Sequence, residues 1–159
     1  MENNYYAYNS PFGKMMICSN GKAITFIEPG GKIKLTGCNK ANALTDKAAE
    51  QLEEYFAGKR RKFDLPLDPQ GTQFQRLVWN ALLKIPYGET RSYKQIAQMV
   101  GNPKACRAVG MANNKNPIWI VIPCHRVIGA DGSLTGYGGG LDMKQRLLEL
   151  EKADITLSK

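Results

Sequence analysis

The chain has 159 residues, of which 43% are hydrophobic and 23% are charged, and its 22 Lys and Arg residues outnumber its 14 Asp and Glu residues. These values are typical of a globular protein with one good core or two small ones, and they exclude the disordered and fibrous classes. No apolar run approaches the ~20 residues that cross a bilayer, and the N-terminus MENNYYAYNS lacks the basic and apolar regions of a signal peptide. We therefore expect a cytoplasmic protein, or a nuclear one in a eukaryote, with no role at a membrane.

Residues 1–70 predict a small α/β domain. Two runs rich in apolar residues, at 14–19 and 22–27, are separated by Asn20-Gly21, the dipeptide that two-residue β-hairpin turns prefer. The sequence therefore predicts a β-hairpin near the N-terminus.

A helix and a linker are expected to complete this domain. Thr45 is the predicted cap of a helix that runs through Phe56 and stops at Gly58. The basic run KRRK at 59–62 is typical of a targeting or DNA-contacting cluster, or else of a solvated loop. PLDPQG at 66–71 predicts the linker to the second domain.

Residues 71–159 predict a second, mostly helical domain. Thr72 and Gln75 have the spacing of a capping box, and the apolar rhythm of a helix follows until Pro86 interrupts it. The positions expected to face the core are Phe74, Leu77, Val78, Ala81, Leu82 and Ile85.

Two shorter helices are expected next. One starts at Ser92, which has Gln95 at the spacing of a capping box, and ends at Gly101. Another is capped by Asn102, has Pro103 at its first position and extends to Ala112. Two short helices around a glycine-containing turn match a helix-turn-helix, although any helical hairpin has the same pattern.

The positive charge is concentrated around these helices. Between Arg76 and Arg126 there are eight Lys and Arg residues against a single acid, Glu89. Such a block favours a polyanion as binding partner, most simply nucleic acid, although a basic surface without function has the same composition.

The last of the three helices carries small residues and one long side chain, that of Arg107. These residues suit either close approach to DNA or close packing on other helices. These residues are Ala105, Cys106, Arg107, Ala108, Gly110 and Ala112.

The stretch NPIWIVIPCHRVIG at 116–129 places Cys124 and the only histidine, His125, after five apolar residues that predict a buried strand. A neighbouring imidazole increases the thiolate fraction of a cysteine, so this pair is typical of a nucleophile. Adjacent residues of a strand face opposite ways, so only a bend, which Pro123 can impose, brings both into one site. The residues alone are also compatible with a buried, inert cysteine and a structural histidine.

Residues 130–140, ADGSLTGYGGG, precede a final helix expected at Asp142 to Glu151. The glycines match neither a dinucleotide fingerprint nor a P-loop, so a loop that approaches a ligand closely fits better.

The four cysteines show no CxxC spacing and there is one histidine, so we expect free thiols, no disulfide and no metal site.

Taken together, these motifs resemble a known family. PCHRVIG at 123–129, preceded by NP and followed by GSLTGYGGGL, is similar to the active-site signature of the O6-alkylguanine-DNA alkyltransferases, the methylated-DNA–protein-cysteine methyltransferases. The resemblance covers Thr72 to Glu151 and, more faintly, the N-terminal part, and RAVG seventeen residues before the cysteine makes it highly specific. It implies a ribonuclease H-like α/β domain followed by a domain that combines the helix-turn-helix and the active site.

The resemblance also implies a function in DNA repair. The alkyl group of O6-alkylguanine in duplex DNA, with O4-alkylthymine as a further candidate, would pass irreversibly to Cys124, once per molecule and without a cofactor. His125 would take the proton of Cys124 through a water, Glu151 would orient the imidazole, and Asn116 would brace the site. The Tyr93 hydroxyl would neutralise O6 of the departing guanine. The residues expected to contact the base are Tyr137, Gly138 through its backbone N–H, and Cys124 and Val127 through their carbonyls.

DNA contacts follow from the same resemblance. The alkylated base would be flipped out of the duplex, with the last helix of the helix-turn-helix in the minor groove and Arg107 in the vacated stack. A monomer bound to double-stranded DNA is expected. The further expected DNA contacts are Ala105, Cys106, which stands where the family commonly has alanine, Ala108, Gly110 and Arg126.

Three other functions compete with this one. An alkyltransferase-like protein binds lesions without transfer, but such proteins replace the acceptor cysteine, which is present here. A plain helix-turn-helix regulator explains the basic block but not PCHR or the glycine-rich loop. A Cys-His hydrolase has no use for a basic helix.

Overall fold

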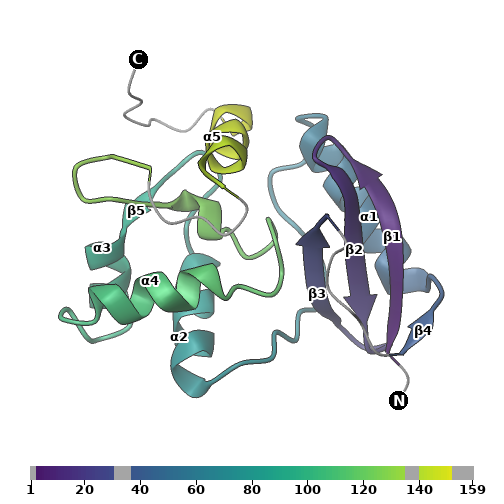
Figure 1. Ribbon diagram of the computed structural model, residues 1–159, viewed down its shortest axis with the longest axis horizontal. Coiled ribbons are helices and arrows are strands. Elements are labelled where there is room, and N and C mark those ends of the chain that lie inside the picture. Colours follow the sequence, from purple (N-terminus) through teal and green to yellow (C-terminus); the bar gives the residue numbers. More distant parts are fainter. Residues whose placement is uncertain (1–2, 31–36, 135–139, 152–159) are drawn as a thin grey trace. The chain divides into compact units, whose positions relative to one another are not determined.

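The computed structural model describes residues 3–30, 37–134 and 140–151 (Figure 1). The chain divides into two compact units. One comprises residues 1–70 with Pro117–Trp119, and the other comprises Gly71–Asn116 and residues 120–159. Within the described ranges, no helix is long and apolar enough to cross a membrane.

The first unit is a four-stranded sheet with one helix packed on it. Strands β1 (Asn4–Ser10), β2 (Gly13–Ser19) and β3 (Ile24–Pro29) are joined antiparallel, and the two-residue β4 (Cys38–Asn39) pairs parallel to β1, in the order β3-β2-β1-β4. The predicted hairpin is β2–β3. At its turn, the Asn20 side chain accepts the N–H groups of Lys22 and Ala23, and Gly21 has a φ of +88°.

Helix α1 (Ala43–Phe56) begins earlier than the sequence predicts. Its N-cap is Asn42, whose side chain accepts the Thr45 N–H at 2.9 Å, while Thr45 Oγ1 accepts the Asn42 N–H at 2.8 Å. The prediction of Thr45 as the cap is therefore wrong, because this reciprocal pair satisfies both backbone donors one turn earlier. The buried face of α1 packs on the sheet through Ala48, Leu52 and Tyr55.

Residues 117–119 pair with β3 of the first unit, which the sequence does not predict. The Ile27 N–H donates to the Pro117 carbonyl at 2.9 Å, and the Trp119 N–H donates to the Ile27 carbonyl at 3.1 Å. The strand expected over 118–122 is absent from this described segment: its residues are buried, but only Ile118 makes a bridge. Ile120 then has a φ of +70°, a left-handed backbone that is rare for a β-branched residue, and the extended pairing ends there.

The second unit is mostly helical. Its helices are α2 (Gln73–Leu82), α3 (Tyr93–Met99), α4 (Cys106–Asn114) and α5 (Leu141–Leu150), and between them lie β5 (Arg91–Ser92), the short 3-10 helix η1 (Cys124–Arg126) and β6 (Val127–Ile128). The capping boxes predicted at Thr72 and Ser92 are confirmed, each with the glutamine three residues on. Helices α3 and α4 pack together as the expected helix-turn-helix.

Two details of these helices differ from the prediction. Helix α4 begins at Cys106 rather than Pro103, because the Ala105 N–H donates to the Asn102 carbonyl at 3.0 Å and residues 102–105 close a separate turn. Leu77, expected in the core, is 48% exposed on α2.

Candidate active site

Cys124 and His125 lie in the single turn of η1, so they are not on opposite faces of a strand. Pro123 precedes the turn, and the Cys124 N–H donates to the Ile122 carbonyl at 2.8 Å. Cys124 is 6% exposed. Directly afterwards β6 pairs in parallel with β5, which ends where Tyr93 begins α3. This short sheet therefore links the start of the helix-turn-helix to the turn that carries the cysteine.

His125 is bound to Glu151 by its Nε2 atom. The distance from His125 Nε2 to Glu151 Oε2 is 2.7 Å, and both side chains are fully buried. Because an ionised carboxylate only accepts hydrogen bonds, we place the imidazole proton on Nε2 and leave Nδ1 as the basic nitrogen. Nδ1 is buried and has no hydrogen-bond partner within the part of the chain that the structure describes. It is the ring atom that can receive a proton.

The charges around this pair favour a neutral histidine and an ionised glutamate. Burial lowers the pKa of His125, Glu151 raises it, and the positive charges of Arg126 and Lys144 lower it again, with a net decrease. Burial alone would raise the pKa of Glu151, but hydrogen bonds and charge from His125 and Arg126 lower it to about 2. At neutral pH the pair is therefore a carboxylate and a neutral imidazole.

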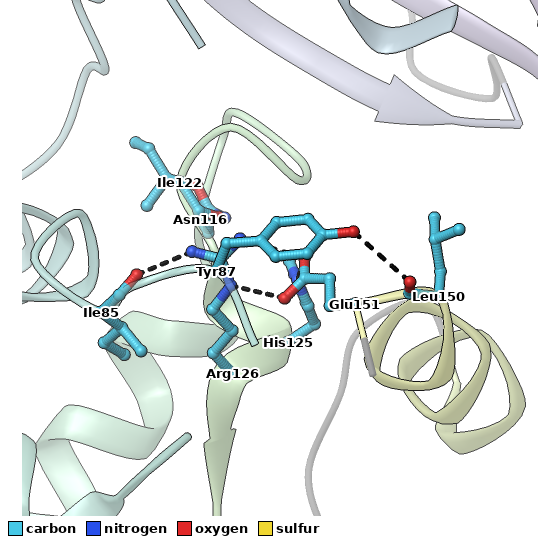
Figure 2. Close-up of polar contacts among 8 residues, drawn as sticks. All are labelled: Ile85, Tyr87, Asn116, Ile122, His125, Arg126, Leu150 and Glu151. Carbon is cyan, nitrogen blue, oxygen red and sulfur yellow. Dashed lines mark hydrogen bonds and ion pairs between the residues drawn. The ribbon is translucent and has the colours of Figure 1, made fainter. Parts of the chain in front are cut away.

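Arg126 does not fit its expected role as a DNA contact. It is 6% exposed, and Figure 2 shows its side chain directed to Ile85 and Glu151. Nε donates to Glu151 Oε1 at 2.7 Å, Nη2 donates to Oε2 at 3.0 Å, and Nη1 donates to the Ile85 carbonyl at 2.7 Å. A buried guanidinium engaged by a carboxylate in this way cannot reach a phosphate.

Two asparagines hold the backbone of the turn. Asn116, expected to brace the site, donates from Nδ2 to the Ile122 carbonyl at 2.7 Å. Asn113, which sequence reasoning missed, is 1% exposed at the end of α4 and donates from Nδ2 to the Cys124 carbonyl at 3.3 Å. The helix expected to contact DNA is therefore tied by a side chain to the cysteine turn.

Lys144 of α5 is a second residue that the sequence reading missed. Its side chain is fully buried, its Nζ donates to the Val127 carbonyl, and it lies 6.0 Å from the ring centroid of Tyr93. Burial lowers the pKa of Lys144 from 10.5 to about 8, while the charge of Cys124 acts to raise it. The helical spacing to the buried Leu147 and Leu148 places Lys144 on the inner face of α5, and that signal was available in the sequence.

The expected DNA-facing residues divide into two groups. Arg107 and Ala108 are exposed on α4, and Ala105 and Cys106 are partly exposed at its start. Gly110 is turned inward, because a Cβ on it would lie 3.8 Å from the Tyr93 ring. Met111, not predicted, is 66% exposed one turn beyond Arg107. Tyr137 and Gly138 lie outside the described residues.

The arrangement suits group transfer to sulfur. It brings together a buried cysteine, a neutral imidazole with a basic nitrogen, and a buried ammonium. All four cysteines lie in the described ranges, and no disulfide joins them. No group of three or more His, Cys, Asp or Glu that could hold a metal occurs among the described residues.

Comparison with known proteins places both parts of the chain in the same family. The family profile "6-O-methylguanine DNA methyltransferase, DNA binding domain" matches residues 73–153, and "6-O-methylguanine DNA methyltransferase, ribonuclease-like domain" matches residues 3–69. The expected fold class, a ribonuclease-like α/β part followed by a helical part, is thereby confirmed.

Individual relatives agree along nearly the whole chain. The methylated-DNA–protein-cysteine methyltransferase of Methanosarcina acetivorans is 52% identical over 152 residues, covering 92% of this chain and 97% of its own length. That of Mycobacterium tuberculosis H37Rv is 49% identical over 161 residues, covering 97% and 98%. The crystal structure of Mycobacterium tuberculosis OGT in complex with DNA superposes with a TM-score of 0.88 at 50% identity, covering 94% of this chain and 92% of that one.

Proposed function

This chain belongs to the 6-O-methylguanine DNA methyltransferase family, and on that premise we propose that Cys124 is the residue that accepts the alkyl group. Its activity is the transfer of a methyl group from methylated DNA to a cysteine of the protein, rather than lesion binding without transfer. The observation that carries the choice of Cys124 is its place in η1, buried beside the Glu151-bound His125.

The reaction we propose is a single displacement at carbon. Nδ1 of His125 receives the Cys124 proton through a water, and the thiolate sulfur attacks the methyl carbon on guanine O6. The new S–C bond forms as the C–O6 bond breaks, and the bonding electrons leave with the guanine. The product is a thioether on Cys124. Water does not release it under mild conditions, so each molecule reacts once.

The departing guanine carries negative charge, and the site supplies groups of the right kind to stabilise it. The proposed donor is the hydroxyl of Tyr93 at the start of α3. Lys144, 6.0 Å from that ring, adds a buried positive charge that favours both the thiolate before the reaction and the anionic base after it. The Val127 carbonyl, proposed to bind the guanine amino group, holds Lys144 in the unbound protein. A carbonyl has a second lone pair, so both donors can share it.

The proposed substrate is O6-alkylguanine in duplex DNA, bound by a monomer. The DNA-binding part of the family covers α2 to α5, and the Mycobacterium tuberculosis relative was crystallised with DNA. We propose that the base is flipped out with Arg107 in its place, because Arg107 is the long exposed side chain on α4 and Ala108 beside it permits close approach.

Label transfer to cysteine variants tests the assignment. Duplex DNA carrying an O6-[3H]methylguanine is incubated with the wild type, with Cys124→Ser and with the matched control Cys106→Ser. Cys106 is the other cysteine of this unit and is partly exposed on α4. Label is expected on the wild type and on Cys106→Ser only. Label on Cys124→Ser at the wild-type level would contradict the assignment, and binding to the lesion by that variant shows that it is folded.

A further inference from the structure

Arg126 is a buried cation beside the active site that the proposed reaction does not use. Its three hydrogen bonds join three separate parts of the unit: η1 itself, Glu151 after α5, and the Ile85 carbonyl after α2 (Figure 2). The ring of Tyr87 covers the guanidinium, with its centroid 5.7 Å from Cζ. This burial and these hydrogen bonds hold the guanidinium in place and strengthen its effect on neighbouring charges.

Glu151 is shared between two donors. Oε1 accepts from Arg126 Nε at 2.7 Å, whereas Oε2 accepts from His125 Nε2 at 2.7 Å and from Arg126 Nη2 at 3.0 Å. A lone carboxylate this close to an imidazole would favour the imidazolium. An imidazolium cannot take a proton from Cys124, so an unshared Glu151 would reduce the fraction of His125 that is available as the base.

We propose that Arg126 is a positioning residue that divides the charge of Glu151, so that Glu151 orients His125 without stabilising its protonated form. The guanidinium fork holds both carboxylate oxygens, and its charge repels a proton from the ring. Arg126 thus acts on Cys124 only through Glu151 and His125. The idea rests on the proposed role of His125 as the base.

The other charges around His125 act in known directions. Burial opposes protonation of the ring most strongly, Lys144 of α5 also opposes it, and Glu151 favours it. Cys124 lies beside the ring in η1, and Tyr87 adjoins Arg126 from the segment between α2 and β5. Lys144 is expected to oppose protonation less than Arg126 does, since it donates to the Val127 carbonyl, whereas Arg126 donates to the carboxylate itself.

Because His125 is the only histidine, NMR of the imidazole reports on it without assignment. We would titrate the wild type, Arg126→Gln, Arg126→Lys and a control, Arg76→Gln, which removes an exposed arginine of α2. In Arg126→Gln the imidazole is expected to take up its proton at least ~1 pH unit higher than in the wild type. Arg126→Lys keeps the charge but not the fork, so a smaller upward shift is expected. Arg76→Gln should titrate as the wild type does.

In Arg126→Gln, the pH at which the rate of methyl transfer falls off on the acid side should rise together with the pH of the imidazole titration. A purely structural role would instead lower the rate equally at every pH. An unchanged titration in folded Arg126→Gln would overturn the proposal, and where that variant does not fold, an unchanged titration in Arg126→Lys would do so. The titration uses no DNA, so it stands or falls separately from the transfer activity.

Discussion

Lys144 offers a test of the site electrostatics that needs no substrate. A pKa lowered from 10.5 to about 8 corresponds to about 3 kcal/mol, at ~1.4 kcal/mol per pH unit. The folded pKa lies below the unfolded one, so between pH 8 and 10.5 the unfolded chain binds the proton more tightly, and the free energy of unfolding rises with pH. Below pH 8 Lys144 is charged in both the folded and the unfolded chain, so the full cost of burying its charge lowers the free energy of unfolding.

The substitution Lys144→Met removes this titration. Urea unfolding of both proteins from pH 7 to 10.5 should show the wild type gaining about 3 kcal/mol relative to the variant across that range. The lost hydrogen bond to the Val127 carbonyl adds an offset that does not change with pH. Lys84→Met replaces an exposed lysine after α2 and serves as the control: it shows how far a lysine-to-methionine change by itself alters the dependence of the unfolding free energy on pH. A difference between wild type and Lys144→Met that does not change with pH would show that the pKa of Lys144 is not lowered in the folded protein.

Three further predictions follow from the same structure. Arg107→Ala should slow transfer from duplex DNA more than reaction with free O6-methylguanine, as measured by single-turnover rates, and equal losses would argue against base flipping. Glu151→Gln should lower the free energy of unfolding at pH 7 by ~3 kcal/mol or more, because it leaves the Arg126 charge buried without its partner. That deficit should shrink as pH falls from 4.5 towards 2, where the wild-type Glu151 itself becomes protonated; a constant deficit in acid unfolding curves would contradict its lowered pKa. Thr72→Ala should lower the free energy of unfolding by ~1 kcal/mol, because the N-cap of α2 is lost, and should leave the transfer rate per folded molecule unchanged. A slower transfer would show that this cap also affects the active site.

The helices of the second unit were predictable because local signals define them. The capping boxes at Thr72 and Ser92 fix two starts, and both appear in the structure. The start of α4 was misplaced because Asn102-Pro103 is equally suited to a helix start and to a turn, and the observed hydrogen bond from Ala105 to Asn102 selects the turn.

The sheet of the first unit was only half predictable. β2 and β3 carry apolar residues around Asn20-Gly21, whereas β1 is rich in Asn and Tyr and shows no apolar alternation. β1 is a strand because β2 on one side and β4 on the other satisfy its backbone. The pairing of residues 117–119 with β3 is likewise non-local, and the five apolar residues there could not reveal that the chain leaves extended pairing at Ile120.

The site shows the same division. Cys124 and His125 were found from a motif, and the 3-10 turn explains how adjacent residues serve one site. Arg126 was expected to contact DNA on the family resemblance, but its partner Glu151 lies 25 residues further on and could not be paired with it from the sequence. The spacing of Lys144 to Leu147 and Leu148 already predicted its inward position, but its contacts with Val127 and Tyr93 arise only from tertiary packing and could not be predicted.

The mass of the intact protein after incubation with a duplex containing one O6-methylguanine shows whether Cys124 takes up the methyl group. We expect a gain of one methyl group, located on the peptide that contains Cys124, which does not increase with excess DNA. An unchanged mass despite lesion-dependent binding, or a methyl group on another residue, would contradict it.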